Sequence, residues 1–219
     1  MHSRLEPSFE RLRVPGWHGC PNPGYGIKTE FQGGSLELRA LLIGCEHKPS
    51  FQIFTLKMNN TLVTETDLKF LRQAIEVSRR SRENGNHPFG AILVSSAGEV
   101  LLEAENSVNT TKDATGHAET NLMRLASQKF SKEILKTSTM YSSCEPCVMC
   151  SGAMYWAGVK RLIYALPEAR LYEITGANPE NPTMHMPCRE VLARGQRKFE
   201  VLGPALEEEA AAVHTGFWE

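Results

Sequence analysis

The sequence predicts an α/β fold in which helices are layered against one sheet. The prediction rests on two observations. From about residue 66 to residue 214, short apolar runs of strand length alternate with amphipathic segments of helix length. The composition, with 41% hydrophobic and 22% charged residues among 219, is typical of a globular protein of one ordinary domain.

The first clear element is a helix that Thr66 or Asp67 can cap and that Gly85 ends. Its apolar residues recur with the spacing of one helix face. Gly and Pro then separate the later segments, and Pro146 suits the first turn of a helix. The later elements are predicted in this order: strands at 89–95 and 99–105, a polar loop at 106–116, a helix at about 117–129, a strand at 138–142, a helix at about 146–158, a strand at 160–166, a Pro-rich loop with short helical pieces at 167–187, a short helix at 189–194, a strand at 199–202 and a helix at 205–214.

Residues 1–57 differ in composition from the rest of the chain. They hold 7 Gly and 5 Pro, which is 12 of 57 positions, against 17 of 162 positions in residues 58–219. They show neither a sustained helical period of apolar residues nor the sustained alternation that is typical of a strand. We interpret 1–57 as a weakly structured N-terminal extension that need not be native, with Met58 as a candidate biological start and 58–219 as the functional domain.

Charge and hydropathy exclude several classes of function. A net charge of −1 argues against a protein that binds nucleic acid by nonspecific phosphate contacts. No apolar run has the length of a membrane-spanning helix, and no apolar stretch follows the N-terminal charges as it would in a signal peptide. We therefore expect a cytoplasmic protein that contacts no membrane.

Six cysteines are too few for a disulfide scaffold in a chain of this length, but three of them form the cluster Cys144-x-x-Cys147-x-x-Cys150. Such a cluster indicates metal binding or redox chemistry. A catalytic zinc takes three protein ligands and leaves a fourth position to water, and His117, Cys147 and Cys150 supply such a set. Helix N-termini at His117 and Cys147 would favour the thiolates.

Glu119 is two residues from His117, too close to bind the same ion comfortably, so we expect it to move protons to and from the water. The alternative is a structural zinc site in which Cys144 supplies a fourth ligand. Cys144 is otherwise a packed small side chain, and Cys20, Cys45 and Cys188 are interpreted as plain thiols.

The order His117-Ala118-Glu119 followed by Pro146-Cys147-Val148-Met149-Cys150 matches the signature of the zinc nucleobase deaminases. Over residues 66–219 the sequence resembles the cytidine/deoxycytidylate deaminase superfamily, and it looks most like the bacterial guanine deaminase and cytosine deaminase branch. The sequences of segments 87–91 and 153–157 are close to the corresponding sequences of guanine deaminases.

This resemblance implies a three-layer α/β/α sandwich with a mixed five-stranded sheet, one catalytic zinc per chain and a homodimer. It also implies hydrolytic deamination: a zinc-bound hydroxide attacks the amino-bearing carbon of the base, Glu119 carries the protons, and ammonia leaves.

The same resemblance assigns substrate-binding roles. Asn106 matches a base-binding Asn, and the Ala118 N–H is expected to contact a carbonyl oxygen of the base. Each position also has a plainer interpretation, as a turn residue for Asn106 and as core or C-terminal packing for the aromatic residues. The aromatic candidates are Phe89 and Trp156 as pocket walls and Phe217 and Trp218 as a tail that closes over the base.

Two features depart from the family pattern. Guanine deaminases tend to carry a carboxylate after the fourth strand, and Arg170 stands at the matching offset here, with Glu168 or Glu173 as possible substitutes. The insert 176–187 fits no branch and is a candidate for reshaping the pocket.

We therefore predict a zinc hydrolase that releases ammonia from a free nucleobase: guanine, cytosine or an isocytosine-like ring. A tRNA adenosine deaminase and a nucleoside deaminase are the alternatives, and a non-enzymatic zinc protein is a further one. RNA binding is disfavoured because residues 58–219 carry 17 positive and 20 negative residues, a net of −3.

Overall fold

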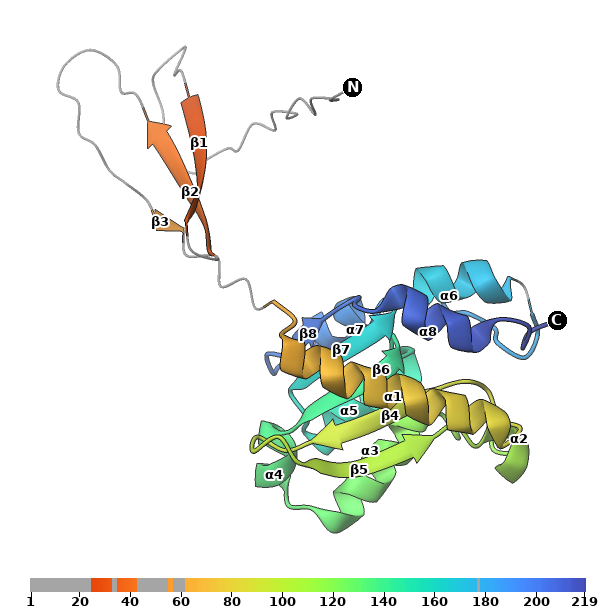
Figure 1. Cartoon of the computed structure of the whole chain (residues 1–219). Coiled ribbons are helices and arrows are strands. Elements are labelled where there is room, and N and C mark those ends of the chain that lie inside the picture. The colour runs from red at the N-terminus through yellow and green to blue at the C-terminus, as the bar shows by residue number, and fades with distance from the viewer. Residues whose placement is uncertain (1–24, 33–34, 43–54, 57–61, 177) are drawn as a thin grey trace, which may run out of the picture. The chain divides into compact units, whose positions relative to one another are not determined.

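The computed structural model describes residues 25–32, 35–42, 55–56, 62–176 and 178–219 (Figure 1). The chain divides into two compact units, Met1–Asn60 and Thr61–Glu219. In the first unit, strands β1 (Tyr25–Gln32), β2 (Ser35–Leu42) and β3 (Thr55–Leu56) form an antiparallel sheet in the order β1-β2-β3. The sequence analysis predicted no strands there. Met58, the candidate start, lies outside the described residues.

The second unit is built on the mixed five-stranded sheet that the sequence predicted, in the order β5-β4-β6-β7-β8. β4 pairs antiparallel with β5 and with β6, whereas β6, β7 and β8 run parallel. The strands are β4 (Gly90–Val94), β5 (Val100–Glu105), β6 (Thr139–Cys144), β7 (Arg161–Leu166) and β8 (Glu200–Leu202).

Helices cover both faces of this sheet, which confirms the predicted three-layer α/β/α sandwich (Figure 1). On one face, residues of α1 (Glu65–Glu83) and α8 (Glu207–His214) pack with Ile92 and Ile163. On the other face, residues of α3 (Ala118–Lys129), α5 (Val148–Ala157) and α7 (Cys188–Ala193) pack with Leu93 and Leu162. Side chains of β4 alternate between the two clusters because successive strand residues point to opposite faces.

The first helix of this unit begins earlier than predicted. Thr64, not Thr66 or Asp67, is its N-cap, and Thr64 and Asp67 form a capping box. The Asp67 carboxylate accepts the Thr64 backbone N–H at 2.9 Å and also the Tyr141 hydroxyl at 2.7 Å. Asp67 therefore joins the start of α1 to the middle of β6.

β4 and α1 approach each other closely at Gly90. A Cβ atom at this position would lie 2.7 Å from the Ala74 carbonyl oxygen, which is closer than Cβ atoms approach other atoms in proteins. Only glycine fits between the two backbones without a shift. The close approach fixes the position of Phe89, the residue directly before the strand.

Three short helices lie in segments whose sequence gave weak signals. α2 (Val108–Thr111) lies in the predicted polar loop and α4 (Lys132–Thr137) lies before β6. α6 (Glu168–Thr175) lies in the Pro-rich segment, where short helical pieces were predicted. In the part of the chain that the structure describes, no helix combines the length and apolarity that crossing a membrane requires.

Candidate active site

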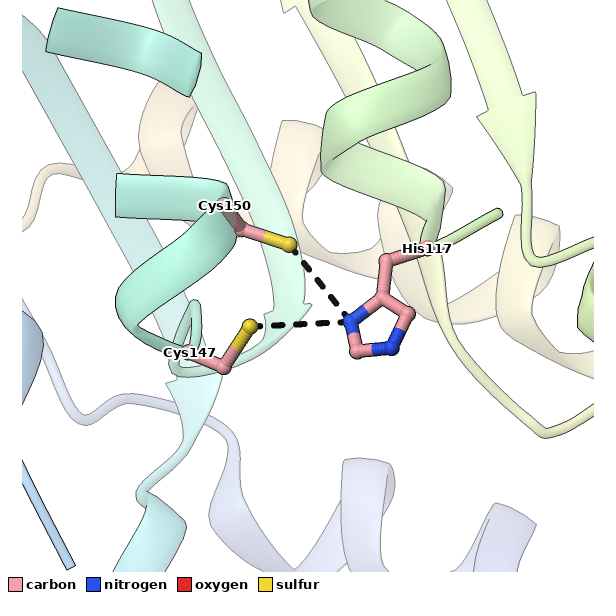
Figure 2. A group of neighbouring side chains, drawn as sticks. All are labelled: His117, Cys147 and Cys150. Carbon is pink, nitrogen blue, oxygen red and sulfur yellow. Dashed lines mark hydrogen bonds between the residues drawn. The ribbon is translucent and has the colours of Figure 1, made fainter. Parts of the chain in front are cut away.

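The side chains of His117, Cys147 and Cys150 converge at two helix starts (Figure 2). His117 is the N-cap of α3 and Cys147 the N-cap of α5, with Cys150 in the first turn of α5. The Nδ1 atom of His117 lies 3.6 Å from each Sγ atom, and all three ligand atoms lie within 4.8 Å of one another. Tetrahedral zinc with ordinary bond lengths separates its N and S ligands by about 3.6 Å, so the set fits a zinc ion.

The electrostatics of the cluster favour a cation. A hydrogen bond from Cys150 lowers the pKa of the Cys147 thiol, and His117 contributes further. The pKa of Cys150 is raised by the same pairing and by burial. A second thiolate at this place therefore needs a positive charge beside it, which a divalent metal ion supplies.

Cys144 does not join the metal-binding group among the described residues. Its buried Sγ atom lies 3.6 Å from Nε2 of His214 in α8. The cluster thus offers three protein ligands, which is the pattern of a catalytic zinc site with an open position, not of a closed structural one. Cys188 is also buried, and Cys20 and Cys45 lie outside the described residues.

Glu119 lies in the first turn of α3, beside the metal-binding group. It is 5% exposed, its Oε1 accepts the Ser142 hydroxyl at 2.7 Å, and its Oε2 lies 3.3 Å from the Cys150 sulfur. Burial raises the pKa of Glu119, and the negative charge at Cys147 raises it further. A buried carboxyl group with a raised pKa, oriented by hydrogen bonds beside the metal-binding group, is suited to take up and release protons.

Asn106, directly after β5, is 1% exposed and fixed by several bonds. Its backbone N–H donates to the Phe89 carbonyl at 3.1 Å, and its Oδ1 accepts the Val108 N–H at 3.0 Å. Its Nδ2 is the one buried side-chain N or O atom without a hydrogen-bond partner in the described residues. An unpaired buried donor is costly, so this amide suits a ligand that brings an acceptor.

Ala118 is the first residue of α3 and is fully buried. The N–H groups in the first turn of a helix have no partner within the helix. The Ala118 N–H therefore has no partner within α3, and its contact with the base stays a prediction.

Phe89 and the C-terminal segment form an aromatic cluster with two histidines. The Phe89 ring lies 5.4 Å from His214 and 6.2 Å from Trp218, and His87 lies 6.0 Å from Phe217. Trp218 stacks on His214 and donates its Nε1–H to His214 Nδ1 at 3.2 Å. Three of the four aromatic residues singled out from the sequence thus lie together.

The fourth, Trp156, lies elsewhere. It is 82% exposed near the end of α5, where it packs edge-on against Tyr155 at 5.9 Å. It does not belong to the aromatic cluster around Trp218, and its role as a pocket wall stays a prediction.

The structure separates the three candidates for a second carboxylate. Arg170 is exposed and paired with Glu173 at 2.6 Å. Glu168 is half-buried, and burial together with the charges of Glu145 and Cys147 raises its pKa to about 7. Among these three residues, Glu168 is the half-buried carboxyl group.

Sequence reasoning missed two residues that organise the site. Ser142 orients Glu119, and Glu145 accepts two backbone N–H groups, from Glu168 at 3.1 Å and from Cys188 at 2.9 Å. The signal for Ser142 was present, since a polar residue in a buried strand requires a partner. No local signal pointed to the partners of Glu145, which lie 23 and 43 residues away.

The sheet, the metal-binding group and the buried Glu119 define the class of zinc-binding deaminases, and comparison with known proteins agrees. Residues 64–166 match the family described as the cytidine and deoxycytidylate deaminase zinc-binding region. The chain is 40% identical over 162 residues to a probable cytosine deaminase of Schizosaccharomyces pombe, an alignment that covers 74% of this chain and 98% of the yeast protein. The chain belongs to this deaminase family.

Other relatives differ in the substrate their names state. The chain is 39% identical over 97 residues to a guanine deaminase of Bacillus subtilis. That alignment covers 44% of this chain and 62% of the Bacillus protein. It is 35% identical over 96 residues to a tRNA-specific adenosine deaminase of Aquifex aeolicus, in an alignment that covers 44% of this chain and 63% of the Aquifex protein. The solved guanine deaminase of Nitrosomonas europaea has the same fold, with a TM-score of 0.56 at 23% identity over 70% of this chain and 84% of that one.

Proposed function

We propose that the chain is a zinc-dependent hydrolytic deaminase of a free nucleobase, either guanine or a cytosine- or isocytosine-like ring. The observation that carries the proposal is the buried Glu119 carboxyl beside the metal-binding group. The unpaired, buried Nδ2 of Asn106 supports the assignment of this residue to base binding. The near-complete alignment with the yeast protein named a probable cytosine deaminase supports a free base as substrate.

His117, Cys147 and Cys150 would hold the zinc. When bound, zinc lowers the pKa of a water molecule toward neutrality. Glu119 takes the proton of that water and delivers it to a ring nitrogen while the water oxygen forms a bond to the amino-bearing carbon. Glu119 would then move the remaining proton of the added hydroxyl group to the amine. The C–O bond would become a carbonyl as the C–N bond breaks, and ammonia would leave. Ser142 holds Oε1 of Glu119, and Oε2 faces the Cys150 sulfur, so this second oxygen is on the side of the metal-binding group and would transfer the protons.

Asn106 and Ala118 would orient the base, the first through Nδ2 and the second through its backbone N–H. Phe89 would stack on the ring, and Phe217 and Trp218 would close over it, because the three side chains gather at one place. Glu168 is the candidate for the second carboxylate in this proposal, because it is half-buried and begins the helix whose first N–H is capped by Glu145, in the turn before Cys147.

We also propose a homodimer. The 82% exposed Trp156 is an apolar side chain that an interface would cover, and in a dimer it would remain available to line a pocket. The cytoplasmic location remains a prediction.

A tRNA adenosine deaminase is the second candidate function, and it is favoured by the relative in Aquifex aeolicus. Such an enzyme needs a surface that binds RNA phosphates, which a net charge of −3 over residues 58–219 does not favour. A nucleoside deaminase is the third candidate, and it would need space for a ribose beside the base.

The test is ammonia release by the full, zinc-loaded chain from guanine, cytosine, isocytosine, adenine, guanosine, cytidine and tRNA. Turnover of one free base with none of nucleosides or tRNA supports the proposal, and turnover of tRNA alone overturns it. Glu119→Ala and Glu119→Gln should keep their zinc and lose at least about 10²–10⁴ in kcat, since the proton carrier is gone. Glu133→Gln, in the exposed helix α4, is the matched control. A Glu119 variant with the wild-type rate would refute the mechanism.

A further inference from the structure

The insert 176–187 and the C-terminal segment meet at a cavity of about 390 Å³. This cavity is next to the aromatic cluster and shares Phe217 and Trp218 with it. The residues that line the cavity are His87, Asn109, Asn178, Glu180, Phe217, Trp218 and Glu219.

Polar contacts join the insert and the tail into one wall. Asn178 donates its Nδ2–H to the Trp218 carbonyl oxygen at 2.8 Å, and its Oδ1 accepts the Glu180 backbone N–H at 2.9 Å. The Glu180 carboxylate lies 3.4 Å from Nε2 of His87. The wall is therefore held at two points, the Trp218 carbonyl oxygen and the ring of His87, which is two residues before Phe89.

Direct contacts join the cavity to the turn that carries Cys147. Trp218, which lines the cavity, donates its Nε1–H to His214 at 3.2 Å, and Nε2 of His214 lies 3.6 Å from the Sγ atom of Cys144 in the same turn. His87 is buried beneath the wall, and its pKa is lowered first by burial and also by the nearby charge of His117. A substrate that enters beneath Trp218 passes the side chains of the wall.

The charge of this wall is negative. Glu180 and Glu219 are exposed carboxylates, and the other polar lining residues are two amides and His87. No Lys or Arg occurs among the residues that line the cavity. Arg82 lies beside Phe217 at 5.7 Å, but its guanidinium donates to the Val213 and Thr215 carbonyl oxygens at 2.7 and 2.8 Å.

We propose that the insert and the tail form a charge filter at the substrate entrance, in which Glu180 and Glu219 repel molecules that carry phosphate. The filter selects uncharged bases and nucleosides against nucleotides and RNA, whose phosphates would have to pass or remain at this wall. Selection by repulsion of the wrong ligand is a general means of specificity. The inference rests on the proposed function, because it concerns the entrance to that active site.

The test compares wild type with Glu180→Gln, Glu219→Gln and the double variant. Gln retains the size of Glu and can still hydrogen-bond to His87, so the wall keeps its shape. Glu190→Gln is the matched control, because Glu190 is exposed in helix α7 and does not line the cavity. Calorimetry measures the Kd of cytosine, cytidine and CMP, and of guanine, guanosine and GMP, and ammonia release measures kcat/KM for each.

In the double variant, the Kd of the 5′-monophosphates should fall at least about fivefold at 20 mM salt, while the Kd of the bases stays within about twofold. The difference should shrink at 500 mM salt because the repulsion is screened. Unchanged ratios between base and monophosphate, or a wild type that prefers the monophosphates, would overturn the filter. Absence of ammonia from every base would instead contradict the proposed function, and the binding ratios would then decide the filter by themselves.

Discussion

Replacing Glu145 should loosen two helices at once, because its carboxylate caps both. Oε2 accepts the backbone N–H of Glu168, the first residue of α6, and Oε1 accepts that of Cys188, the first residue of α7. The N-cap residues of these helices are Pro167 and Pro187, and neither supplies a side-chain cap. A remote carboxylate thus fulfils the capping role that Ser, Thr or Asp usually has at the N-cap.

Loss of one N-cap costs about 0.5–2 kcal/mol, so Glu145→Ala should lower the free energy of unfolding by about 2–3 kcal/mol. Glu145→Gln keeps one acceptor oxygen and turns an NH₂ group toward the other N–H, so it preserves at most one of the two bonds. Its expected loss is about 1–2 kcal/mol, larger if the two donors repel each other strongly.

Urea unfolding at constant zinc concentration measures the global effect, and amide hydrogen exchange at Glu168 and Cys188 measures the local one. Both amides should exchange faster in either variant. Glu190→Gln, on the exposed surface of α7, is the control and should match wild type. A Glu145→Ala protein whose unfolding free energy lies within about 0.5 kcal/mol of wild type would refute the capping argument.

Three further predictions concern stability, domain organisation and zinc. Burial opposes ionisation of Asp67, but hydrogen bonds from Arg161, Thr64 and Tyr141 hold its pKa at about 2. This pKa is below the unfolded value of about 3.9, so the stabilisation is complete above that pH and is lost as the pH falls through about 2. Asp67→Asn should therefore cost about 1–2 kcal/mol in urea unfolding at pH 7 and progressively less below pH 4, and a pH-independent cost would contradict this. Deletion of residues 1–57 should leave the thermal midpoint and ammonia release unchanged, and an insoluble or inactive product would assign that segment to the domain. Chelation of zinc should abolish ammonia release and lower the thermal midpoint, and Cys150→Ser should reduce the zinc content measured by atomic absorption, whereas Cys188→Ser should not.

Apolar periodicity predicted the layers of the fold because it reports directly which faces are buried. It misplaced the first cap because Thr64, Thr66 and Asp67 are all residues that cap helices. The choice depends on contacts of Asp67 with Tyr141 and Arg161, which are 74 and 94 residues away in the chain. The helix α2 was missed for a similar reason: its Thr110 N–H donates to Asn86 Oδ1 at 3.0 Å, a bond between distant segments.

The metal-binding group could be predicted because its chemistry is local. Two cysteines three residues apart at a helix start face the same way, whatever the rest of the chain does. The position of Trp156 could not be predicted in this way, since the sequence of α5 does not say which of its residues meets the pocket. Its exposure of 82% comes from the way α5 packs on α3 and α7, and only tertiary structure contains that information.

The turn after β6 couples three parts of the site within a few residues. Cys147 belongs to the candidate metal-binding group, Glu145 caps the helices on both sides of the insert, and Cys144 contacts His214. Burial lowers the pKa of His214 to about 4, so its ring is neutral near pH 7. Because Nδ1 accepts the Trp218 indole N–H, the ring proton resides on Nε2 and points to the Cys144 sulfur. The orientation of Trp218 is thus tied to the same turn that carries the metal ligand. Substitutions at Cys144 or His214 should therefore affect closure of the tail and geometry of the metal site together, and their effects on kcat should not be additive.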